Sequence, residues 1–290
     1  MRNDISVIIP AFNAEMYIVE AIESVLSQCG QTTEIIVVND GSTDNTATVL
    51  SKFGKNIKTI YQENAGLSAS RNRGAKEACG DILAFLDADD IWMPQKLQIQ
   101  TEKLASFDVV YSNRLNFGTI GDLPEMQSDI VAMFEGDIWE RLIFGNFITA
   151  SSALIKKSLF EKMGGFNETY RSCEDWDLWL RCSENHLIGY CPDPLVKYRF
   201  HDGSLSKNYL YMQKMRESVL TKALQSNRGR QLSAKKRRAA LASSWGCSAW
   251  EAARAKDYVS AFKCYGLALK YTPFNAHIWY NVARTITGRV

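Results

Sequence analysis

The chain has 290 residues, of which 46% are hydrophobic and 23% charged, and its formal net charge is +2. This composition is typical of a soluble globular protein, excludes a disordered chain and gives no general case for nucleic-acid binding. Seven cysteines without a C-x-x-C pair argue against a disulfide framework or a zinc site and favour a reducing compartment. No eighteen apolar residues run together, so we expect a cytoplasmic protein, or one lying peripherally on the cytoplasmic face of the inner membrane.

Short apolar runs rich in β-branched residues occupy the first third of the chain, at 5–10, 34–40, 57–62 and 81–87. Such runs between polar turns are typical of strands covered on both faces, as in a parallel sheet. The intervening stretches 14–28 and 42–54 have helical spacing or helix-capping residues. This alternation predicts a Rossmann-like α/β domain with a mostly parallel sheet flanked by helices, whose ligand should lie at the carboxyl ends of the strands.

The remaining chain changes character at about residue 208. Before it we expect a strand at 108–113, a less regular stretch at 115–147, a strand and helix within 149–168, and a helix beginning near Glu174. After it, strand signals disappear and the spacing becomes tetratricopeptide-like at Trp245, Ala249, Ala261, Tyr265, Ala268 and Pro273. We therefore predict domains at 1–207 and 208–290, the second being a helical extension with one hairpin that packs on the first domain or binds a partner.

Polar and aromatic residues follow each of the first four predicted strands. They are Pro10 and Phe12, then Asp40, then Asn64 and Arg71, and finally Asp87 and Asp89. No G-x-x-x-x-G-K-[ST] loop occurs, and no G-x-G-x-x-G follows the first strand, so the usual phosphate-binding loops are absent from the sequence.

An unneutralised carboxylate cluster at a strand end is costly, since two charges about 5 Å apart repel by roughly 3 kcal/mol. A divalent cation that bridges Asp87 or Asp89 to a diphosphate would neutralise both. Each residue alone has a simpler interpretation: Asp40 before Gly41 suits a plain turn, Arg71 an exposed helix position, and 87–90 a helix entry. Their occurrence at four successive strand ends favours a shared site.

Six segments, taken in order, resemble those of the family 2 glycosyltransferases of the GT-A fold: "VIIPAFNAE", "EIIVVNDGSTDNT", "ENAGLSASRNRGAKEACGDILAFLDADDIW", "GGFNE", "CEDWDLWLR" and "YRFHDGSLS". The resemblance covers about residues 5–206. It implies an inverting enzyme that uses a nucleotide-diphospho-sugar donor and Mn²⁺ or Mg²⁺.

The resemblance also implies roles for the residues at the strand ends. Asp40 would read the nucleotide base, in a pocket that Pro10 and Phe12 line. Asn64 and Arg71 would help to bind the nucleotide, Asp87 would contact the ribose and Asp89 would hold the metal. His201 occupies a position that some relatives use as a further metal or diphosphate ligand, although a lone histidine is more often a packed or surface residue.

The pair Glu174 and Asp175 matches the family's catalytic acids. Asp175 would be the general base that removes the acceptor proton, and Glu174 would orient a sugar hydroxyl. Because both lie in a predicted first helical turn, the helix dipole should favour the ionised form of the base at neutral pH. The simpler interpretation is that these acids only stabilise the helix, with Asp177 and Arg181 forming an i,i+4 pair.

The basic stretch 235–238 is either the solvated face of a helix or a contact with anionic lipid head groups. The second interpretation suits a transferase whose acceptor is a lipid-linked sugar or another glycan, with a UDP-sugar as the expected donor. No nucleic-acid recognition module accompanies the basic stretch, and the sequence does not indicate the oligomeric state. Two other functions stay open, a sugar nucleotidyltransferase and a non-catalytic nucleotide-sugar-binding or scaffold protein.

Overall fold

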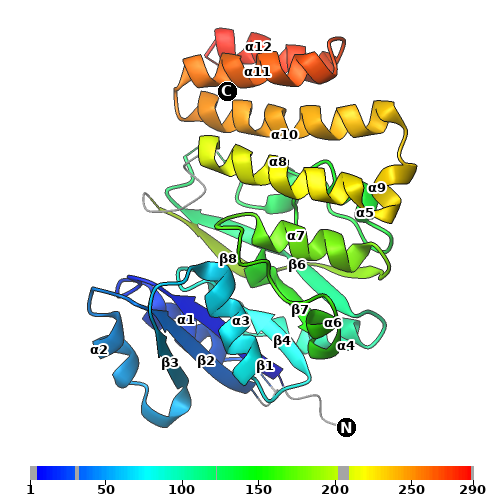
Figure 1. Ribbon diagram of the computed structural model, residues 1–290. Coiled ribbons are helices and arrows are strands. Elements are labelled where there is room, and N and C mark those ends of the chain that lie inside the picture. The colour runs from blue at the N-terminus through cyan, green and yellow to red at the C-terminus, as the bar shows by residue number, and fades with distance from the viewer. Residues whose placement is uncertain (1–4, 30–32, 122, 202–208, 289–290) are drawn as a thin grey trace. The chain divides into compact units, whose positions relative to one another are not determined.

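A computed structural model describes residues 5–29, 33–121, 123–201 and 209–288 (Figure 1). The chain forms two compact units. Unit 1 comprises Met1–Ile138 and Phe147–His201, and unit 2 comprises Trp139–Asn146 and Asp202–Val290. The domain boundary predicted at residue 207 falls outside the described residues and stays a prediction.

Unit 1 contains one eight-stranded sheet with the strand order β3-β2-β1-β4-β7-β6-β8-β5. The strands are β1 (Ile5–Ala11), β2 (Thr33–Asp40), β3 (Lys58–Gln62), β4 (Ile82–Phe85), β5 (Ile91–Trp92), β6 (Val109–Gly118), β7 (Ala153–Lys156) and β8 (Ile188–Phe200). Parallel pairing joins β1 to β2 and β4, β2 to β3, and β6 to β8. Antiparallel pairing joins β7 to β4 and β6, and β5 to β8. The predicted α/β class is confirmed, with a mixed sheet.

Helices of unit 1 cover the sheet on both faces. They are α1 (Ile18–Leu26), α2 (Thr46–Ser51), α3 (Leu67–Glu77), α4 (Lys96–Leu104), α6 (Lys157–Lys162) and α7 (Glu174–Ser183). Alternate residues of β1 divide between the faces: Val7 and Ile9 belong to a buried core with residues of α1 and α4, whereas Ile8 faces α3. A Cβ atom at Gly74 of α3 would lie 2.4 Å from Ile8, so glycine permits this close packing.

Unit 2 is helical, which confirms the predicted helical extension. Its helices are α5 (Trp139–Leu142), α8 (Tyr209–Gln225), α9 (Asn227–Gln231), α10 (Ala234–Arg254), α11 (Tyr258–Tyr271) and α12 (Ala276–Ile286). The last three begin at side-chain caps, since Ser233, Asp257 and Asn275 each accept a backbone N–H bond from the first turn. Small side chains of α10 pack against Tyr265 and Ala268 of α11 in a shared core.

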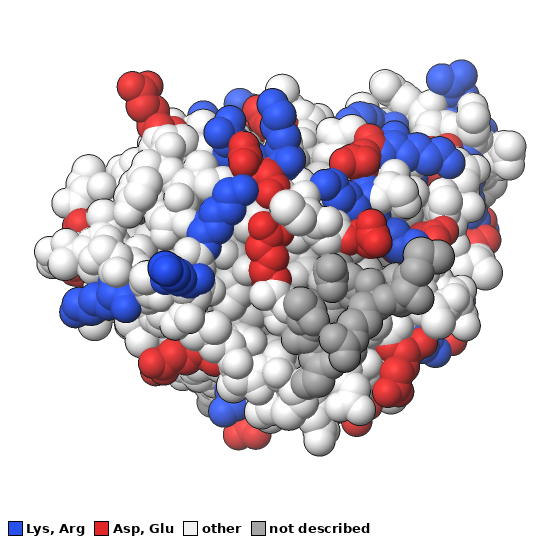
Figure 2. Space-filling model, turned by 90° about the horizontal axis from the view of Figure 1, so that it is seen from below, with Lys and Arg blue, Asp and Glu red and all other residues white. Residues whose placement is uncertain are grey.

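Two further properties concern the helices and the surface charge. Among the described residues, no helix is both long and apolar enough to cross a membrane. On the face shown in Figure 2, acidic and basic side chains lie interspersed among uncharged ones. The charge of this face is therefore mixed.

Candidate active site

The parallel pairing of β1 with β2 and β4 brings the ends of these strands to one edge of the sheet. Pro10 is buried in β1, and Phe12, directly after the strand, is 51% exposed. Asn64 is exposed in the loop that follows β3. An exposed aromatic ring and an exposed amide thus flank the edge where the sequence predicts the nucleotide.

Asp40 is buried at the end of β2 and holds the neighbouring loop. Its carboxylate accepts hydrogen bonds from the Gln62 amide at 2.7 Å and from the backbone N–H groups of Ala65 and Gly66 at 2.9 and 2.8 Å. The next residue, Gly41, has φ +73°, and a Cβ there would lie 2.9 Å from the Asn64 nitrogen. The turn interpretation is therefore correct for local structure, and base reading by Asp40 stays a prediction.

Arg71 of α3 joins two acidic segments that lie far apart in the sequence. Its side chain is 1% exposed, with Nη2 2.5 Å from Asp87 Oδ1 and Nη1 2.5 Å from Glu174 Oε1. The interpretation of Arg71 as an exposed helix arginine is wrong, because the guanidinium fills the space between the two carboxylates. Part of the positive charge that the acidic cluster requires therefore comes from the protein itself.

The aspartates after β4 have different surroundings. Asp89 Oδ2 lies 2.9 Å from His201 Nε2, so the two predicted metal ligands are adjacent. Asp90 is buried and accepts the backbone N–H of Arg199 in β8 at 3.0 Å. Burial, together with the charges of Asp89 and Asp87, raises the pKa of Asp90 well above its usual range. Asp90 is thus a structural residue that fixes the loop after β4 to β8.

Helix α7 presents the two predicted catalytic acids in its first turn. Cys173, directly before it, has φ +62°, a left-handed conformation that is uncommon for a residue with a side chain. Glu174 is buried and paired with Arg71, and Asp175 lies beside it with Oδ1 accepting the Trp176 N–H at 2.7 Å. The turn into α7 therefore directs Glu174 into the ion pair and leaves Asp175 next to it.

Burial and the charge of the neighbouring Glu174, opposed by Arg71, together raise the pKa of Asp175 to about 7. The helix dipole is expected to favour the ionised form, but burial and the second carboxylate act against ionisation, so about half of the Asp175 side chains are ionised at pH 7. A carboxylate with a pKa near 7 is well matched to proton removal at neutral pH.

Asp177 has the local role that its spacing predicts. Its carboxylate pairs with Arg181 at 2.7 Å, and Arg181 also donates to the backbone carbonyls of Met163 and Gly165. This pair fixes α7 to the glycine turn after α6, and it leaves Asp175 as the acid of the first turn suited to catalysis.

Arg114 of β6 is a candidate site residue that sequence reasoning missed. Its guanidinium lies 3.9 Å over the Tyr198 ring, and its buried Nε has no hydrogen-bond partner among the described residues. Burial lowers the pKa of Arg114, while the charges of Asp90 and Asp175 act in the opposite direction. Arg114 is thus a second buried cation within electrostatic range of Asp90 and Asp175. No motif marks this residue, so only the fold reveals it.

The metal-ligating atoms of Asp89 and His201, a carboxylate oxygen and an imidazole nitrogen, suit a hard divalent cation. Mg²⁺ and Mn²⁺ are commonly held by one or two protein ligands together with phosphate oxygens of the substrate. Within the described residues, no group of three His, Cys, Asp or Glu side chains could hold a metal. The residues therefore suit a metal that shares its coordination with a diphosphate.

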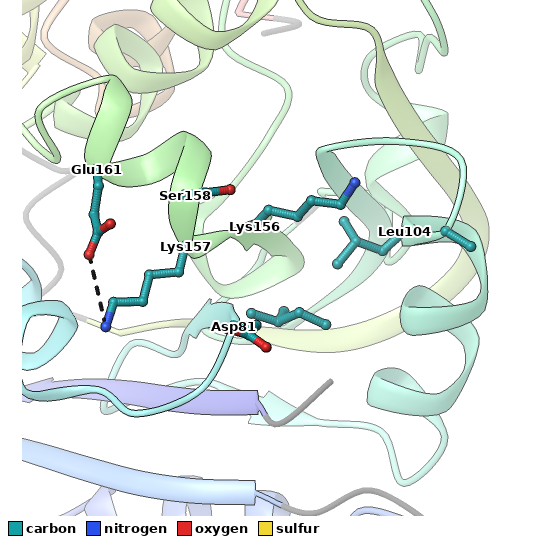
Figure 3. A pocket seen from close by; sticks show the side chains of 8 residues that line it. Asp81, Leu104, Lys156, Lys157, Ser158 and Glu161 are labelled. Carbon is teal, nitrogen blue, oxygen red and sulfur yellow. Dashed lines mark ion pairs between the residues drawn. The ribbon is translucent and has the colours of Figure 1, made fainter. Parts of the chain in front are cut away.

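A pocket of about 550 Å³ lies at the opposite end of β4 (Figure 3). Its cations are paired with nearby protein groups, because Lys157 donates to the Ala78 carbonyl at 2.7 Å and Lys156 pairs with Asp108 at 2.8 Å. Asp81 in its wall precedes β4, whereas Asp87 follows the strand. The pocket is thus separate from the candidate active site.

Comparison with known proteins identifies the relatives of this chain. The family model for glycosyl transferase family 2 matches residues 6–164. The uncharacterized glycosyltransferase RT0329 of Rickettsia typhi is 31% identical over 219 residues, which cover 71% of this chain and 67% of that protein. Two further relatives from the same genus are longer, and the match covers 35% of each.

Solved structures support the fold. The structure of TarS 1–349 from S. aureus in complex with UDP has a TM-score of 0.64 at 19% identity, covering 99% of this chain and 89% of that one. The mannosyltransferase PcManGT of Pyrobaculum calidifontis, in complex with GDP-Man and Mn²⁺, has a TM-score of 0.64 at 16% identity, covering 98% and 85%. The predicted GT-A architecture is therefore confirmed.

Proposed function

Because the chain belongs to glycosyl transferase family 2, and is therefore a glycosyltransferase, we propose that it transfers a sugar with inversion from a nucleotide-diphospho-sugar to a hydroxyl group of a glycan or lipid-linked sugar. The observation that carries this proposal is the bridge made by Arg71. It ties Asp87, on the expected donor side, to Glu174, the neighbour of the expected base. Donor binding and proton removal would then take place in one connected set of side chains.

The proposed reaction is a single displacement at the anomeric carbon, with proton transfer to Asp175. Asp175 takes the proton of the acceptor hydroxyl while that oxygen forms a bond to the anomeric carbon. The bond between the anomeric carbon and the diphosphate oxygen breaks on the opposite side, and the nucleoside diphosphate leaves. Glu174, held by Arg71, would orient a sugar hydroxyl beside the base.

Asp89 and His201 would hold Mn²⁺ or Mg²⁺, which supplies positive charge against the diphosphate when it is bound. The 2.9 Å separation of Asp89 Oδ2 and His201 Nε2 supports a cation shared by the two side chains. The Mn²⁺ in the PcManGT complex supports the choice of metal.

The donor that we propose is a UDP-sugar. Asp40, Pro10, Phe12 and Asn64 would form the base pocket, and Asp87 would contact the ribose. Related folds bind UDP, UDP-GlcNAc and GDP-Man, so the support from these neighbours is for nucleotide-sugars as a class.

We also infer a peripheral contact between unit 2 and an anionic membrane surface on the cytoplasmic side, in keeping with a lipid-linked acceptor. Of the basic stretch, Lys236 pairs with Glu140, and Arg237 donates to the Gly229 carbonyl at 3.3 Å. Lys235 and Arg238 are exposed. These two side chains would make the lipid contact.

Release of nucleoside diphosphate from a panel of nucleotide-sugars with Mn²⁺ tests the proposal. Asp175→Asn should lower turnover by at least about a hundredfold, because general base catalysis typically contributes that much. Binding of UDP with Mn²⁺, measured as a thermal shift, should survive in Asp175→Asn and weaken in Asp89→Ala. Full turnover in either folded variant contradicts the assigned roles. Nucleotide binding without turnover of any donor would favour the scaffold alternative.

A further inference from the structure

The two predicted metal ligands lie on segments that are far apart in the sequence. Asp89 is in the loop between β4 and β5, whereas His201 directly follows β8, 112 positions later. In the described part of the chain, the pairing of β5 with β8 ends at Ile91 and Lys197. The sheet pairing therefore ends before it reaches either ligand.

Arg199 of β8 connects the two segments beyond the end of that pairing. Its backbone N–H donates to Asp90 Oδ1 at 3.0 Å, and its Nε donates to the Asp89 carbonyl at 2.8 Å. Arg199 also lies two residues before His201 in the sequence. One residue thus holds the main chain at the first predicted ligand and belongs to the segment that carries the second.

The guanidinium of Arg199 is itself fixed by side chains from other elements. It lies 4.7 Å from the ring centroid of Tyr17, before α1, and 4.4 Å from that of Phe117 in β6. Its Nη2 pairs with Glu20 of α1, and the whole side chain is 15% exposed. Since Nε and Nη2 both have protein acceptors, these contacts suit a group that fixes a loop in place.

Tyr17 extends this set of contacts to the second ligand. Its ring centroid lies 5.1 Å from that of the His201 imidazole. Asp89 is therefore held through its carbonyl by Arg199, and His201 packs on an aromatic ring that also contacts the guanidinium.

We propose that Arg199 is a positioning residue for the divalent cation, a proposal that rests on the metal role proposed above for Asp89 and His201. By fixing the Asp89 main chain against the end of β8, Arg199 keeps the carboxylate and the imidazole adjacent before the cation binds. Residues that orient metal ligands typically contribute about 10- to 100-fold to metal affinity. Repulsion between a guanidinium and a cation acts in the opposite direction. Positioning and repulsion therefore predict opposite effects when the side chain is removed.

Binding of Mn²⁺ in the presence of UDP tests the proposal, measured from the electron paramagnetic resonance signal of free Mn²⁺. Arg199→Met should weaken Mn²⁺ binding at least about tenfold. Arg199→Lys should recover only part of this loss, because one ammonium group keeps the charge but not the planar fork of donors. Lys197→Met removes the same charge from β8 two residues earlier and is the matched control, which should bind Mn²⁺ as the wild type does.

Two further measurements separate positioning from direct contact with the substrate. The affinity of Arg199→Met for UDP without metal, measured by calorimetry, should match that of the wild type. An excess of Mn²⁺ should restore most of the turnover of this variant. If Arg199→Met does not fold, Arg199→Lys supplies the same comparison.

The outcomes distinguish this proposal from the proposed function. Mn²⁺ binding by Arg199→Met or Arg199→Lys that is as tight as in the wild type overturns the positioning role alone. A loss of metal-free UDP affinity also overturns it, since Arg199 would then contact the nucleotide. No Mn²⁺ binding by the wild type overturns this proposal together with the metal role of Asp89 and His201. Release of nucleoside diphosphate without metal would in that case still support sugar transfer.

Discussion

At the scale of single residues, the site depends on how three carboxylates share one buried guanidinium. Arg71 pairs with Asp87 and Glu174 and also lowers the pKa of Asp175. Removing that charge leaves the buried Glu174 and the partly exposed Asp87 without their partner, which is costly even when the fold survives. We therefore propose that Arg71 is a positioning residue, one that would also set the pH at which Asp175 is ionised.

The pKa of about 7 for Asp175 predicts the pH dependence of the reaction. A general base acts only when it is deprotonated, so turnover should rise as the pH increases through about 7 and then level off. The pH–rate profile at saturating donor measures this rise, the acidic limb of the profile, directly. A profile that is flat between pH 5.5 and 8.5 would contradict the assignment of Asp175 as the base.

Arg71→Met should move that limb of the profile to higher pH. The lost positive charge no longer opposes the burial of Asp175 or the charge of Glu174, so protonation persists to a higher pH. Turnover at pH 7 should fall and recover in part at pH 9, whereas Arg71→Lys, which keeps the charge, should shift the limb less. A uniform loss of rate at every pH in Arg71→Met would indicate a structural role alone.

The sequence predicted which motif residues belong to the site but not which residues they contact. Asp87, Glu174 and Arg71 are recognisable within motifs, but the ion pair of Arg71 with Glu174 spans 103 positions along the chain. No local pattern encodes such a contact. Arg114 carries no motif at all, since its importance lies in the Tyr198 ring and the acids that the fold places around it.

At the scale of elements, α4 contains a buried lysine that no motif explains. Lys96 is fully buried, donates to Gln100 and lies 4.5 Å over the Trp92 ring. Burial lowers the pKa of Lys96 well below its usual value. At pH 7 the unfolded chain holds the Lys96 proton more tightly than the folded chain does. Burial of Lys96 therefore lowers the free energy of unfolding, and this loss becomes smaller as the pH rises toward 10.

Lys96→Met should therefore raise the free energy of unfolding at pH 7, by about 1–2 kcal/mol. The difference from the wild-type chain should shrink at pH 9.5, as the unfolded lysine begins to lose its proton. Urea denaturation at the two pH values measures both effects. Lys103→Met in the same helix, where the amine is partly exposed and pairs with Glu135, is the matched control and should show no gain. A Lys96→Met variant less stable than the wild type would show that the contacts of the amine with Gln100 and Trp92 contribute more to stability than its burial costs.

The elements that could be predicted are those with strong local signals. Apolar runs located β1 to β4, and helical spacing put five residues of α1 on one stripe. Four of these are buried, Ile18, Ala21, Ile22 and Val25, whereas Leu26 is 47% exposed. The two-residue strand β5 and the antiparallel β7 are defined by pairing with β8, β4 and β6, which sequence periodicity does not report. This is why a mostly parallel sheet was expected and a mixed one is found.

At the scale of the whole molecule, the family motifs predict the chemistry of unit 1 but not how the chain is divided. Residues 139–146 lie inside the stretch expected to be irregular, yet they belong to unit 2 with the later helices. There Glu140 pairs with Lys236, and the Phe144 carbonyl accepts from Ser243. Contacts between segments about a hundred residues apart are tertiary, so composition along the chain did not reveal them.

The last prediction concerns the inferred membrane contact, which the net charge of +2 alone would not suggest. Lys235→Glu with Arg238→Glu should weaken binding to vesicles that contain anionic phospholipid. Each basic residue near such a surface contributes about 1 kcal/mol, so a loss of more than tenfold is expected at low salt. Lys52→Glu with Lys55→Glu makes the same change of net charge at exposed sites of unit 1 and should have little effect. Equal losses in the two variants in sedimentation assays would mean that binding follows net charge, and then unit 2 would have no special contact with the membrane.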